Sequence, residues 1–556
     1  MKKKVVSVLL TAAMALSLIA CGNSETGNST ENSKTVKEGA TIEASANLTD
    51  PANINNTVEK DSITIGWKAA TSLDPWGTRN DNPGNYEVYE MLFECNTAGE
   101  RYAVLADESK GEFGGFDHEG GTGVYTVYIY DYIHDHAGNP VTASDVAWSY
   151  NYQYENKDTS GWDDFQGAEA IDDTTVKFTF SQEQTNLGAL DNFLCRCFIV
   201  SEKAFKDSAS ELASDMCGTG PYVFDKYVSG SSLTLTKNDD YWQTDDSLRH
   251  QEQQANVRTI TYQFITEGAQ RSNGLATGTL DMVNDMNYEN ISDFITGGAY
   301  DDSFNVQTYA QKFVYYLNAN CDSAAATSDE NLRKAIYYAI DQDGLITALG
   351  GAYDRIYSYA TSYYSDYDMV DWKSLDNYNT KTSVDAEKVQ SYLDASGYKG
   401  ETLILMVESS YADAGTIIAA QLTSFGINVE LLQCDNATLN STMADPTAWA
   451  LTFGMMAGDY NVQCWTHDFA YANTADGTHT QGFVTDDAWN DLLNLCNTED
   501  GHTSENMEAW WNMAVENAYT MGLFAGNSYN IVPSTCTYVC QGDKLVFLPG
   551  ACCFSE

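Results

Sequence analysis

A glycine- and proline-rich segment near the middle of the chain is the feature that most restricts its fold. Residues Cys217–Tyr222 read Cys-Gly-Thr-Gly-Pro-Tyr. Glycine adopts backbone conformations that other residues avoid and proline fixes its own φ angle, so these residues predict a rigid bend. After the bend, apolar and polar residues alternate on both sides of the Ser-Gly pair at 229–230, which is typical of a half-buried β-hairpin.

The same segment continues to Lys-Asn-Asp-Asp-Tyr-Trp at residues 237–242, and as a whole it resembles the central motif of family 5 of the bacterial extracellular solute-binding proteins. This family includes the oligopeptide- and dipeptide-binding receptors of ABC importers. The resemblance implies an α/β protein with the two-lobed type II periplasmic-binding-protein (Venus-flytrap) fold and an extra domain inserted in the first lobe.

Motifs of the same family precede the bend in the expected order. A strand predicted at 61–66 leads to Ser-Leu-Asp-Pro at 72–75, which resembles the family's opening motif, and residues 88–93 resemble the helix that follows it. The sequence Gly-Asn-Pro-Val-Thr-Ala-Ser-Asp-Val at 138–146 is similar to the family's most recognisable signature, which opens a helix. Its threonine and aspartate stand three residues apart, as a capping box requires.

Predicted strands at 125–130 and 171–180 flank this signature, because both segments alternate apolar and polar residues. His134 and His136 lie two residues apart and share a face of an extended segment, as a metal site could use. No cysteine or carboxylate cluster at ligand spacing accompanies them, and the family often has a structural histidine at the place of His136. We therefore expect a structural role and no metal.

The second half of the chain predicts a second lobe. It begins near residues 313–318, and residues 332–341 resemble a helix of the family. The apolar residues of this helix fall at helical spacing and leave Arg333, Lys334 and Gln342 for the solvent-exposed face.

Between residues 401 and 431 the apolar residues are spaced first as in a strand, then as in a helix, and then again as in a strand. This order predicts a β-α-β unit. Residues 523–533 resemble the family's final return to the first lobe. Together these matches imply the following division of the chain: signal peptide 1–20, lipidated cysteine and flexible linker 21–60, lobe I from 61–93, 218–305 and 520–556, inserted domain 94–217, and lobe II 306–519.

The N-terminus has the pattern of an exported lipoprotein. Three lysines at 2–4 precede an apolar run from Val5 to Ala20, which is a charged n-region followed by a short h-region. The run ends Leu-Ile-Ala-Cys-Gly and resembles a lipobox, so Cys21 is the expected lipidation site. An ordinary cleavage site in a secreted protein is the alternative. We expect a protein anchored by lipid on the extracytoplasmic face of the bacterial cell membrane.

The 79 acidic and 29 basic residues give a net charge of −50. Such a charge repels nucleic acid at short range and so excludes it as a partner. A preference for cationic ligands would fit, but solubility is the simpler explanation.

Twelve cysteines remain besides Cys21, and they are scattered along the chain. Outside the cell an even number permits disulfides, although the connectivity cannot be deduced from sequence. Free, partly buried thiols are an equally good explanation. The spacing does not resemble a zinc site.

Residues 451–461 resemble the stretch that lines the ligand cleft of the family, where a peptide runs beside an extended backbone and an aspartate binds its α-ammonium group. Carried over, Met455 and Ala457 would offer main-chain hydrogen bonds and Asp459 would pair with the ammonium group. After Asp459 and Tyr460 the sequence continues Asn-Val-Gln and lacks an expected proline, which leaves the choice between a peptide and another solute open.

Aromatic residues are the remaining candidates for ligand contact. Trp67, Trp449 and Trp465 could stack on a ligand, and Tyr460 lies next to the predicted ammonium partner. Core packing is the more common role of tryptophan. A basic partner for a peptide carboxylate, such as Arg355, cannot be chosen from the sequence.

The sequence carries no nucleophile elbow, His-Glu-x-x-His zinc motif, phosphate loop or dinucleotide glycine fingerprint. We therefore expect a monomeric binding protein that needs no cofactor and is not an enzyme. The resemblance implies that it captures oligopeptides or dipeptides and delivers them to an ABC permease with its partner ATPase. Oligosaccharides, opine-like solutes and nickel chelates are alternative ligands, and a lipid-anchored hydrolase is the alternative of another class.

Overall fold

A computed structural model describes residues 57–555, apart from gaps at 69, 71, 78–81, 96–100, 111–122, 158–161, 163, 182–192, 352, 363, 365, 458–468, 472–473, 475–476, 499, 538–539 and 542–545. The predicted signal peptide, the lipidation site Cys21 and most of the predicted linker lie outside the described residues. Within the described part, no helix is long and apolar enough to cross a membrane.

A large mixed sheet dominates the described part of the chain. Its eleven strands are ordered β14-β13-β15-β11-β16-β10-β1-β9-β8-β7, with β12 paired to β16. The bounds are β1 Lys60–Trp67, β7 Tyr222–Val228, β8 Ser232–Lys237, β9 Val257–Phe264, β10 Met282–Met286, β11 Phe304–Ala319, β12 Tyr353–Arg355, β13 Leu403–Glu408, β14 Val429–Cys434, β15 Leu451–Ala457 and β16 Thr520–Pro533.

Smaller sheets and the helices complete the fold. A three-stranded sheet is ordered β4-β6-β5, and three two-stranded pairs are β2 with β3, β17 with β20, and β18 with β19. Their bounds are β2 Phe93–Cys95, β3 Arg101–Ala103, β4 Gly123–Tyr128, β5 Phe165–Asp172, β6 Thr175–Phe180, β17 Cys536–Thr537, β18 Cys540–Gln541, β19 Val546–Phe547 and β20 Cys553–Phe554. The helices are α2 Asn85–Val88, α3 Ala143–Asn156, α5 Glu202–Asp207, α6 Gly268–Ala276, α7 Glu330–Ala339, α8 Gln342–Ala348, α9 Ala386–Ser396, α10 Ala412–Ser424, α11 Asn436–Met443, α13 Asp487–Cys496 and α14 Ser504–Glu516.

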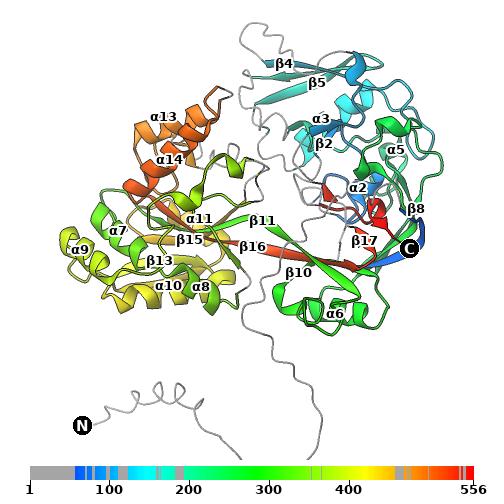
Figure 1. The fold of residues 1–556 in the computed structure, drawn as a ribbon. Coiled ribbons are helices and arrows are strands. Elements are labelled where there is room, and N and C mark those ends of the chain that lie inside the picture. The colour runs from blue at the N-terminus through cyan, green and yellow to red at the C-terminus, as the bar shows by residue number, and fades with distance from the viewer. Residues whose placement is uncertain are drawn as a thin grey trace, which may run out of the picture. The chain divides into compact units, whose positions relative to one another are not determined.

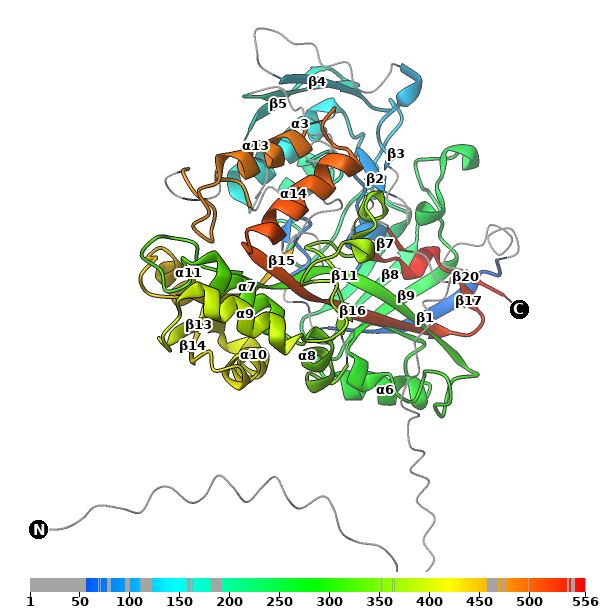
Figure 2. The same cartoon turned by 60° about the vertical axis from the view of Figure 1, so that its left-hand side comes forward.

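Two long strands, β11 and β16, run through the middle of the large sheet and connect its two ends (Figure 1). At one end, β13, β14 and β15 are parallel, and in Figures 1 and 2 the helices α7, α9 and α10 gather around them. At the other end, β1 is parallel to β9 and β10, and α6 packs beside β10. Antiparallel pairing of β11 with β16 extends from Phe304 opposite Pro533 to Asn318 opposite Thr520.

Each part of the fold has its own hydrophobic core. The core around β1, β7–β9 and the bend contains Ile65, Tyr222 and Tyr262. A second core packs β11, β13, β15 and the start of β16 against α7, α8, α9, α10, α13 and α14. A third lies between α3 and the three-stranded sheet β4-β6-β5. The domain boundaries predicted from the sequence stay a prediction.

The bend at Cys217–Tyr222 is packed against α2 and the residues that follow it. The amide of Gly220 donates to the Val88 carbonyl at 2.9 Å, and a Cβ on Gly218 or Gly220 would lie only 2.1 Å from the Val88 oxygen or 2.4 Å from the Glu87 oxygen. Neither glycine has a positive φ angle. The glycines are therefore required for close backbone approach and not, as the sequence suggested, for an unusual conformation. The predicted hairpin follows as β7 and β8.

The structure confirms several local predictions. Thr142 and Asp145 form the predicted capping box at the start of α3, and β13, α10 and β14 form the predicted β-α-β unit with parallel strands. His136 has a structural role, because its Nε2–H donates to the Gly220 carbonyl at 2.9 Å while its Nδ1 accepts from the Gly218 amide at 3.3 Å.

Two predicted elements were wrong. Residues 88–93 are not a helix, because α2 ends at Val88 and the carbonyls of Val88, Glu90 and Leu92 accept hydrogen bonds from distant segments. Residues 171–180 are not one strand. The Asp172 carboxylate accepts from the Thr174 amide at 2.9 Å and forms a turn between β5 and β6.

Two side chains predicted to face solvent beside α7 are buried. Arg333 is only 5% exposed and donates to backbone carbonyls, among them those of Ser328 and Asn517, both at 2.8 Å. Gln342 is 2% exposed and donates to the Gly522 carbonyl at 3.0 Å. Both side chains are buried because they satisfy the hydrogen-bonding needs of buried backbone carbonyls.

Candidate ligand-binding site

The predicted cleft-lining segment begins as strand β15, which has one open edge. On one side β15 pairs with β11 along its full length, from Leu451 to Ala457. On the other side β13 pairs only with the first three residues, up to Phe453, because the chain leaves the sheet after Glu408. Among the described residues, none pairs with that edge from Gly454 to Ala457. Unpaired backbone groups at a sheet edge can accept an added strand.

The two faces of this open segment differ. Gly454 lies against the ring of Tyr316, whose hydroxyl would be 2.6 Å from a Cβ at that position, so only glycine fits. On the opposite face, Met455 lies directly across from Tyr315 and is 37% exposed. The exposed methionine next to an open strand edge marks an accessible apolar surface.

The predicted site residues are only partly described. Met455 and Ala457 lie on the open edge of β15, and their predicted main-chain hydrogen bonds to a ligand stay a prediction. Asp459, Tyr460 and Trp465 lie outside the described residues, so their predicted roles stay predictions.

The two described tryptophan candidates lie in different environments. Trp67 ends β1, is half-buried, and packs edge-to-face on Tyr262 with ring centroids 5.2 Å apart. Trp449 is 2% exposed and donates its indole N–H to the Met443 carbonyl at 3.3 Å. Trp449 is therefore a core residue, whereas the role of Trp67 stays a prediction.

A charged cluster that sequence reasoning missed lies beside Trp67. Lys68 forms an ion pair with Asp285 near the end of β10, and Asp285 also accepts a hydrogen bond from the Ser528 hydroxyl in β16. Asp285 has a positive φ of 48°. Burial raises the pKa of its carboxyl group, but Lys68, Ser528 and Arg271 more than offset this, so that the net shift is downward. No local pattern links residues so far apart in sequence.

At both ends of the large sheet, parallel strands have their carboxyl ends near β16. In open α/β sheets, ligands bind outside the carboxyl ends of the strands. Ser528 contacts the Lys68–Asp285 pair, while Phe524 pairs with Tyr315 next to the open edge of β15. These two residues of β16 are four apart, which corresponds to about 13 Å along a strand. An extended ligand of a few residues matches this length.

The pairing of β11 with β16 is interrupted between these two regions. The register shifts between Ala310 and Val314, so the two strands are not continuously hydrogen-bonded where they connect the two ends of the sheet. An irregularity at this point allows bending with little loss of hydrogen bonds.

Two buried carboxyl groups lie in and just after α2, at Glu87 and Glu90. Glu87 accepts a hydrogen bond from the hydroxyl of Tyr262 at 2.8 Å, and Glu90 accepts one from the indole of Trp242 at 2.8 Å. Burial raises the pKa of each to about 7. Glu90 thus connects the segment after α2 to the Asp-Tyr-Trp end of the central motif, whereas Glu87 connects α2 to β9.

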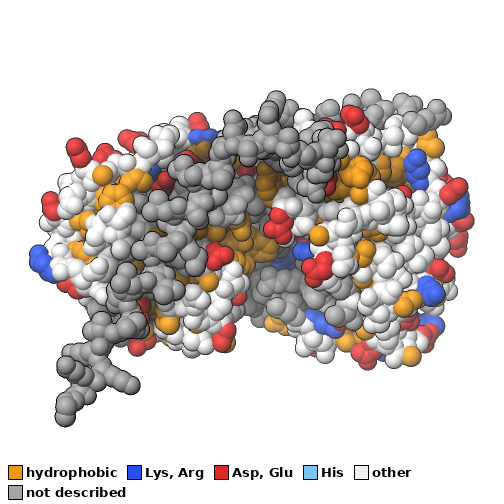
Figure 3. All heavy atoms as spheres, turned by 90° about the horizontal axis from the view of Figure 1, so that it is seen from below, with side chains coloured by type: hydrophobic (Ala, Val, Ile, Leu, Met, Phe, Trp, Pro, Cys, Tyr) orange, Lys and Arg blue, Asp and Glu red, His pale blue; other side chains and the backbone are white. Residues whose placement is uncertain are grey.

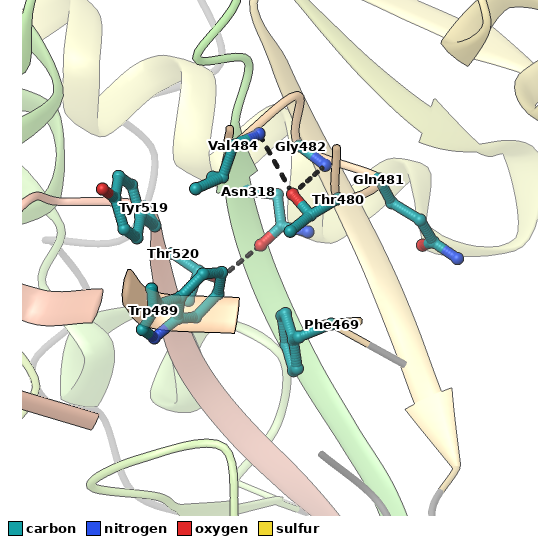
Figure 4. Close-up of a pocket in the computed structure, with 9 residues that line it drawn as sticks. All are labelled: Asn318, Phe469, Thr480, Gln481, Gly482, Val484, Trp489, Tyr519 and Thr520. Carbon is teal, nitrogen blue, oxygen red and sulfur yellow. Dashed lines mark hydrogen bonds between the residues drawn. The ribbon is translucent and has the colours of Figure 1, made fainter. Parts of the chain in front are cut away.

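A separate small pocket lies at one end of β11 (Figure 4). Its polar groups bond mainly to one another: the Thr520 hydroxyl donates to Asn318, and the Thr480 hydroxyl accepts from the amides of Gly482 and Val484. It contains none of the predicted site residues. Its lining consists of Asn318, Phe469, Thr480, Gln481, Gly482, Val484, Trp489, Tyr519 and Thr520.

Cysteines and charges give no sign of a metal centre in the described part of the chain. There, no group of three or more His, Cys, Asp or Glu side chains could hold a metal ion. Free thiols among the cysteines whose side chains the structure describes are Cys197, Cys217, Cys321, Cys434, Cys496, Cys536, Cys552 and Cys553. Acidic side chains are scattered over the face in Figure 3 and form no single patch there, which fits a role in solubility.

Known proteins resemble this chain in sequence and in fold. The probable D,D-dipeptide-binding periplasmic protein DdpA of Escherichia coli K12 is 24% identical over 440 residues, which are 74% of this chain and 76% of DdpA. The crystal structure of a putative peptide binding protein AppA from Clostridium difficile has a TM-score of 0.70 at 15% identity and covers 89% of this chain and 100% of AppA. NikA from Staphylococcus aureus, solved in complex with Ni(L-His)2, has a TM-score of 0.61 at 16% identity, over 89% of this chain and 100% of NikA.

These similarities confirm the predicted α/β fold of a type II periplasmic binding protein. The profile described as bacterial extracellular solute-binding proteins, family 5 Middle, matches residues 115–479, well over half of the chain. The chain belongs to family 5 of the bacterial extracellular solute-binding proteins.

Proposed function

We propose that this protein captures oligopeptides or dipeptides and delivers them to the permease of an ABC importer, which a partner ATPase energises. The observation that carries the proposal is the open edge of β15 from Gly454 to Ala457, beside the carboxyl end of β13. A peptide added to this edge would be held through its backbone, which binds many sequences with similar strength.

Asp459 is the proposed partner of the peptide's α-ammonium group, because it follows the open edge by two residues. A carboxylate beside a backbone-held peptide makes a charge-assisted hydrogen bond to its N-terminus. The interrupted pairing of β11 and β16 between Ala310 and Val314 is the proposed hinge on which the two ends of the sheet close around the ligand.

A calorimetric titration of the purified full-length chain with short peptides tests this proposal. We expect free-amine peptides to bind, N-acetylated peptides to bind at least about tenfold more weakly, and Asp459→Asn to remove most of that difference. Asp302→Asn, at an exposed aspartate, is the matched control. Binding of nickel–histidine or an oligosaccharide without peptide binding would contradict the proposed ligand. Peptide cleavage during the titration would point to the hydrolase alternative.

Anchoring by lipid at Cys21 is proposed from the lipobox-like sequence alone. We expect metabolic labelling with a fatty-acid analogue to mark the wild-type chain and not Cys21→Ser. Equal labelling of both would place any lipid elsewhere.

A further inference from the structure

Five aromatic rings gather on the face of the sheet that carries Met455. Tyr315 lies at their centre, with ring-centroid distances of 4.9 Å to Phe524, 5.4 Å to Tyr411, 5.8 Å to Tyr353 and 6.0 Å to Phe453. These residues come from four separate strands and from the turn Ser409–Tyr411 after β13. Aromatic rings at these distances stabilise one another and form a rigid surface.

The cluster has a buried floor and an accessible rim. Phe453 and Phe524 are each 1% exposed, whereas Tyr315, Tyr353 and Tyr411 are only half-buried. The rings of Tyr315 and Tyr411 are nearly perpendicular, with an interplanar angle of 77°, which is the edge-to-face arrangement that aromatic pairs favour.

Met455 extends this surface to the open edge of β15. It pairs with Tyr315 across the two strands, so their side chains lie on the same face. Its flexible thioether can adapt to an apolar partner and makes favourable contacts with aromatic rings.

Tyr411 lies just beyond the end of β13. The chain turns away from the sheet through Ser409–Tyr411, so a peptide strand added to the open edge of β15 would occupy the position next to β15 that β13 occupies up to Glu408. Side chains of an extended segment alternate between the two faces. One of them would therefore reach the face of Met455, between Met455 and Tyr411.

We infer that Tyr411, Tyr315 and Met455 form a subsite that selects an aromatic side chain of the bound peptide over small, aliphatic or charged ones. The inference rests on the proposed function, because it requires a peptide on the edge of β15. Rings and a thioether offer a new partner dispersion and edge-to-face contacts, which a glycine cannot use. A charged side chain would lose hydration on this apolar surface.

Calorimetry with a set of tetrapeptides tests the subsite. The peptides carry Phe, Leu, Lys or Gly at one position at a time on an otherwise constant sequence. At one position we expect the Phe peptide to bind about tenfold more tightly than the Gly peptide. Tyr411→Ala and Met455→Ala should each reduce this ratio of affinities to below about threefold.

The matched control is Tyr392→Ala, which removes a partly buried tyrosine of α9 that stacks on Tyr338 at 5.6 Å in the same core. It should keep the full Phe-to-Gly ratio. Met455→Ala keeps the test valid if Tyr411→Ala does not fold, because Met455 is exposed. Three results would contradict the proposed subsite alone: equal affinity for the Phe and Gly peptides at every position, tighter binding of the Lys peptide, or an unchanged ratio of Phe to Gly affinity in both variants. Failure of all peptides to bind would overturn the proposed function and the subsite with it.

Discussion

The hydroxyl of Tyr262 donates a hydrogen bond of 2.8 Å to Oε1 of Glu87, and both side chains are buried. Tyr262 also supports Trp67 through an edge-to-face contact. A carboxyl group that is buried in this way favours its neutral form, because burial penalises the charge. The pKa of Glu87 is accordingly raised to about 7.

We expect the contribution of Glu87 to the stability of the protein to fall as the pH rises from about 4.5 to 7. In this range the folded protein keeps the proton on Glu87 that the unfolded chain has lost, so the stabilisation present below pH 4.5 disappears as the pH passes the folded pKa of about 7. Glu87→Gln should resemble the wild type at pH 5 and be more stable by about 2 kcal/mol at pH 8. Urea unfolding at pH 5, 6, 7 and 8 measures this difference.

Glu155→Gln, at an exposed position of α3, is the control and should follow the wild-type pH profile. A Glu87→Gln variant with the wild-type profile would show that Glu87 is not the titrating group.

Gly218→Ala should destabilise the protein by about 2–4 kcal/mol, because the new Cβ would overlap a backbone oxygen that no side-chain rotation can move. The position of that Cβ is 2.1 Å from the Val88 carbonyl oxygen. Gly230→Ala is a useful comparison, since Gly230 has a φ of +69° and open space around it, so its cost should be about 1 kcal/mol from backbone strain alone. Unfolding midpoints in urea compare the two variants, and equal midpoints would contradict the close-packing explanation.

Local sequence signals predicted two kinds of feature. The capping box of Thr142 and Asp145 depends on local hydrogen bonds, and the β-α-β unit from 401 to 431 shows itself in the spacing of its apolar residues. The helix predicted at 88–93 does not form because carbonyls of this segment accept hydrogen bonds from the amides of Gly220, Ile199 and Val104, which lie outside it. Propensity cannot show such tertiary hydrogen bonds.

The candidate site was predictable only where a family motif covers it. The resemblance of 451–461 identified the strand with the open edge, including Met455 and Ala457. It did not identify Tyr315 and Tyr411, which lie in other strands or turns and meet only in the folded sheet. The Lys68–Asp285 pair was missed for the same reason, since 217 residues separate its members.

Arg333→Lys should destabilise the protein by about 3 kcal/mol. The guanidinium group of Arg333 donates to four backbone carbonyls with its fork of N–H groups, and a lysine ammonium cannot reach them all, so buried acceptors would lose their partners. Lys334→Ala, at the next position of α7, removes only an ion pair with Glu330 near the surface and should cost below about 0.5 kcal/mol. Thermal and urea unfolding measure both, and a stable Arg333→Lys would contradict the account.

Closure of the two ends of the sheet should be detectable at the interruption between Ala310 and Val314. Backbone amides near a break in the strand pairing open more readily than those in a continuous ladder, so they should exchange hydrogen faster in the free protein. A bound peptide that holds both ends of the sheet together should slow this exchange, while amides of the continuous β1–β9 pairing from Ser62 to Trp67 should change little. Hydrogen exchange followed by mass spectrometry, with and without a peptide that binds, compares the two segments. If the peptide slowed exchange equally in both segments, or only in β1, the motion would lie elsewhere and β11 and β16 would form a rigid connection.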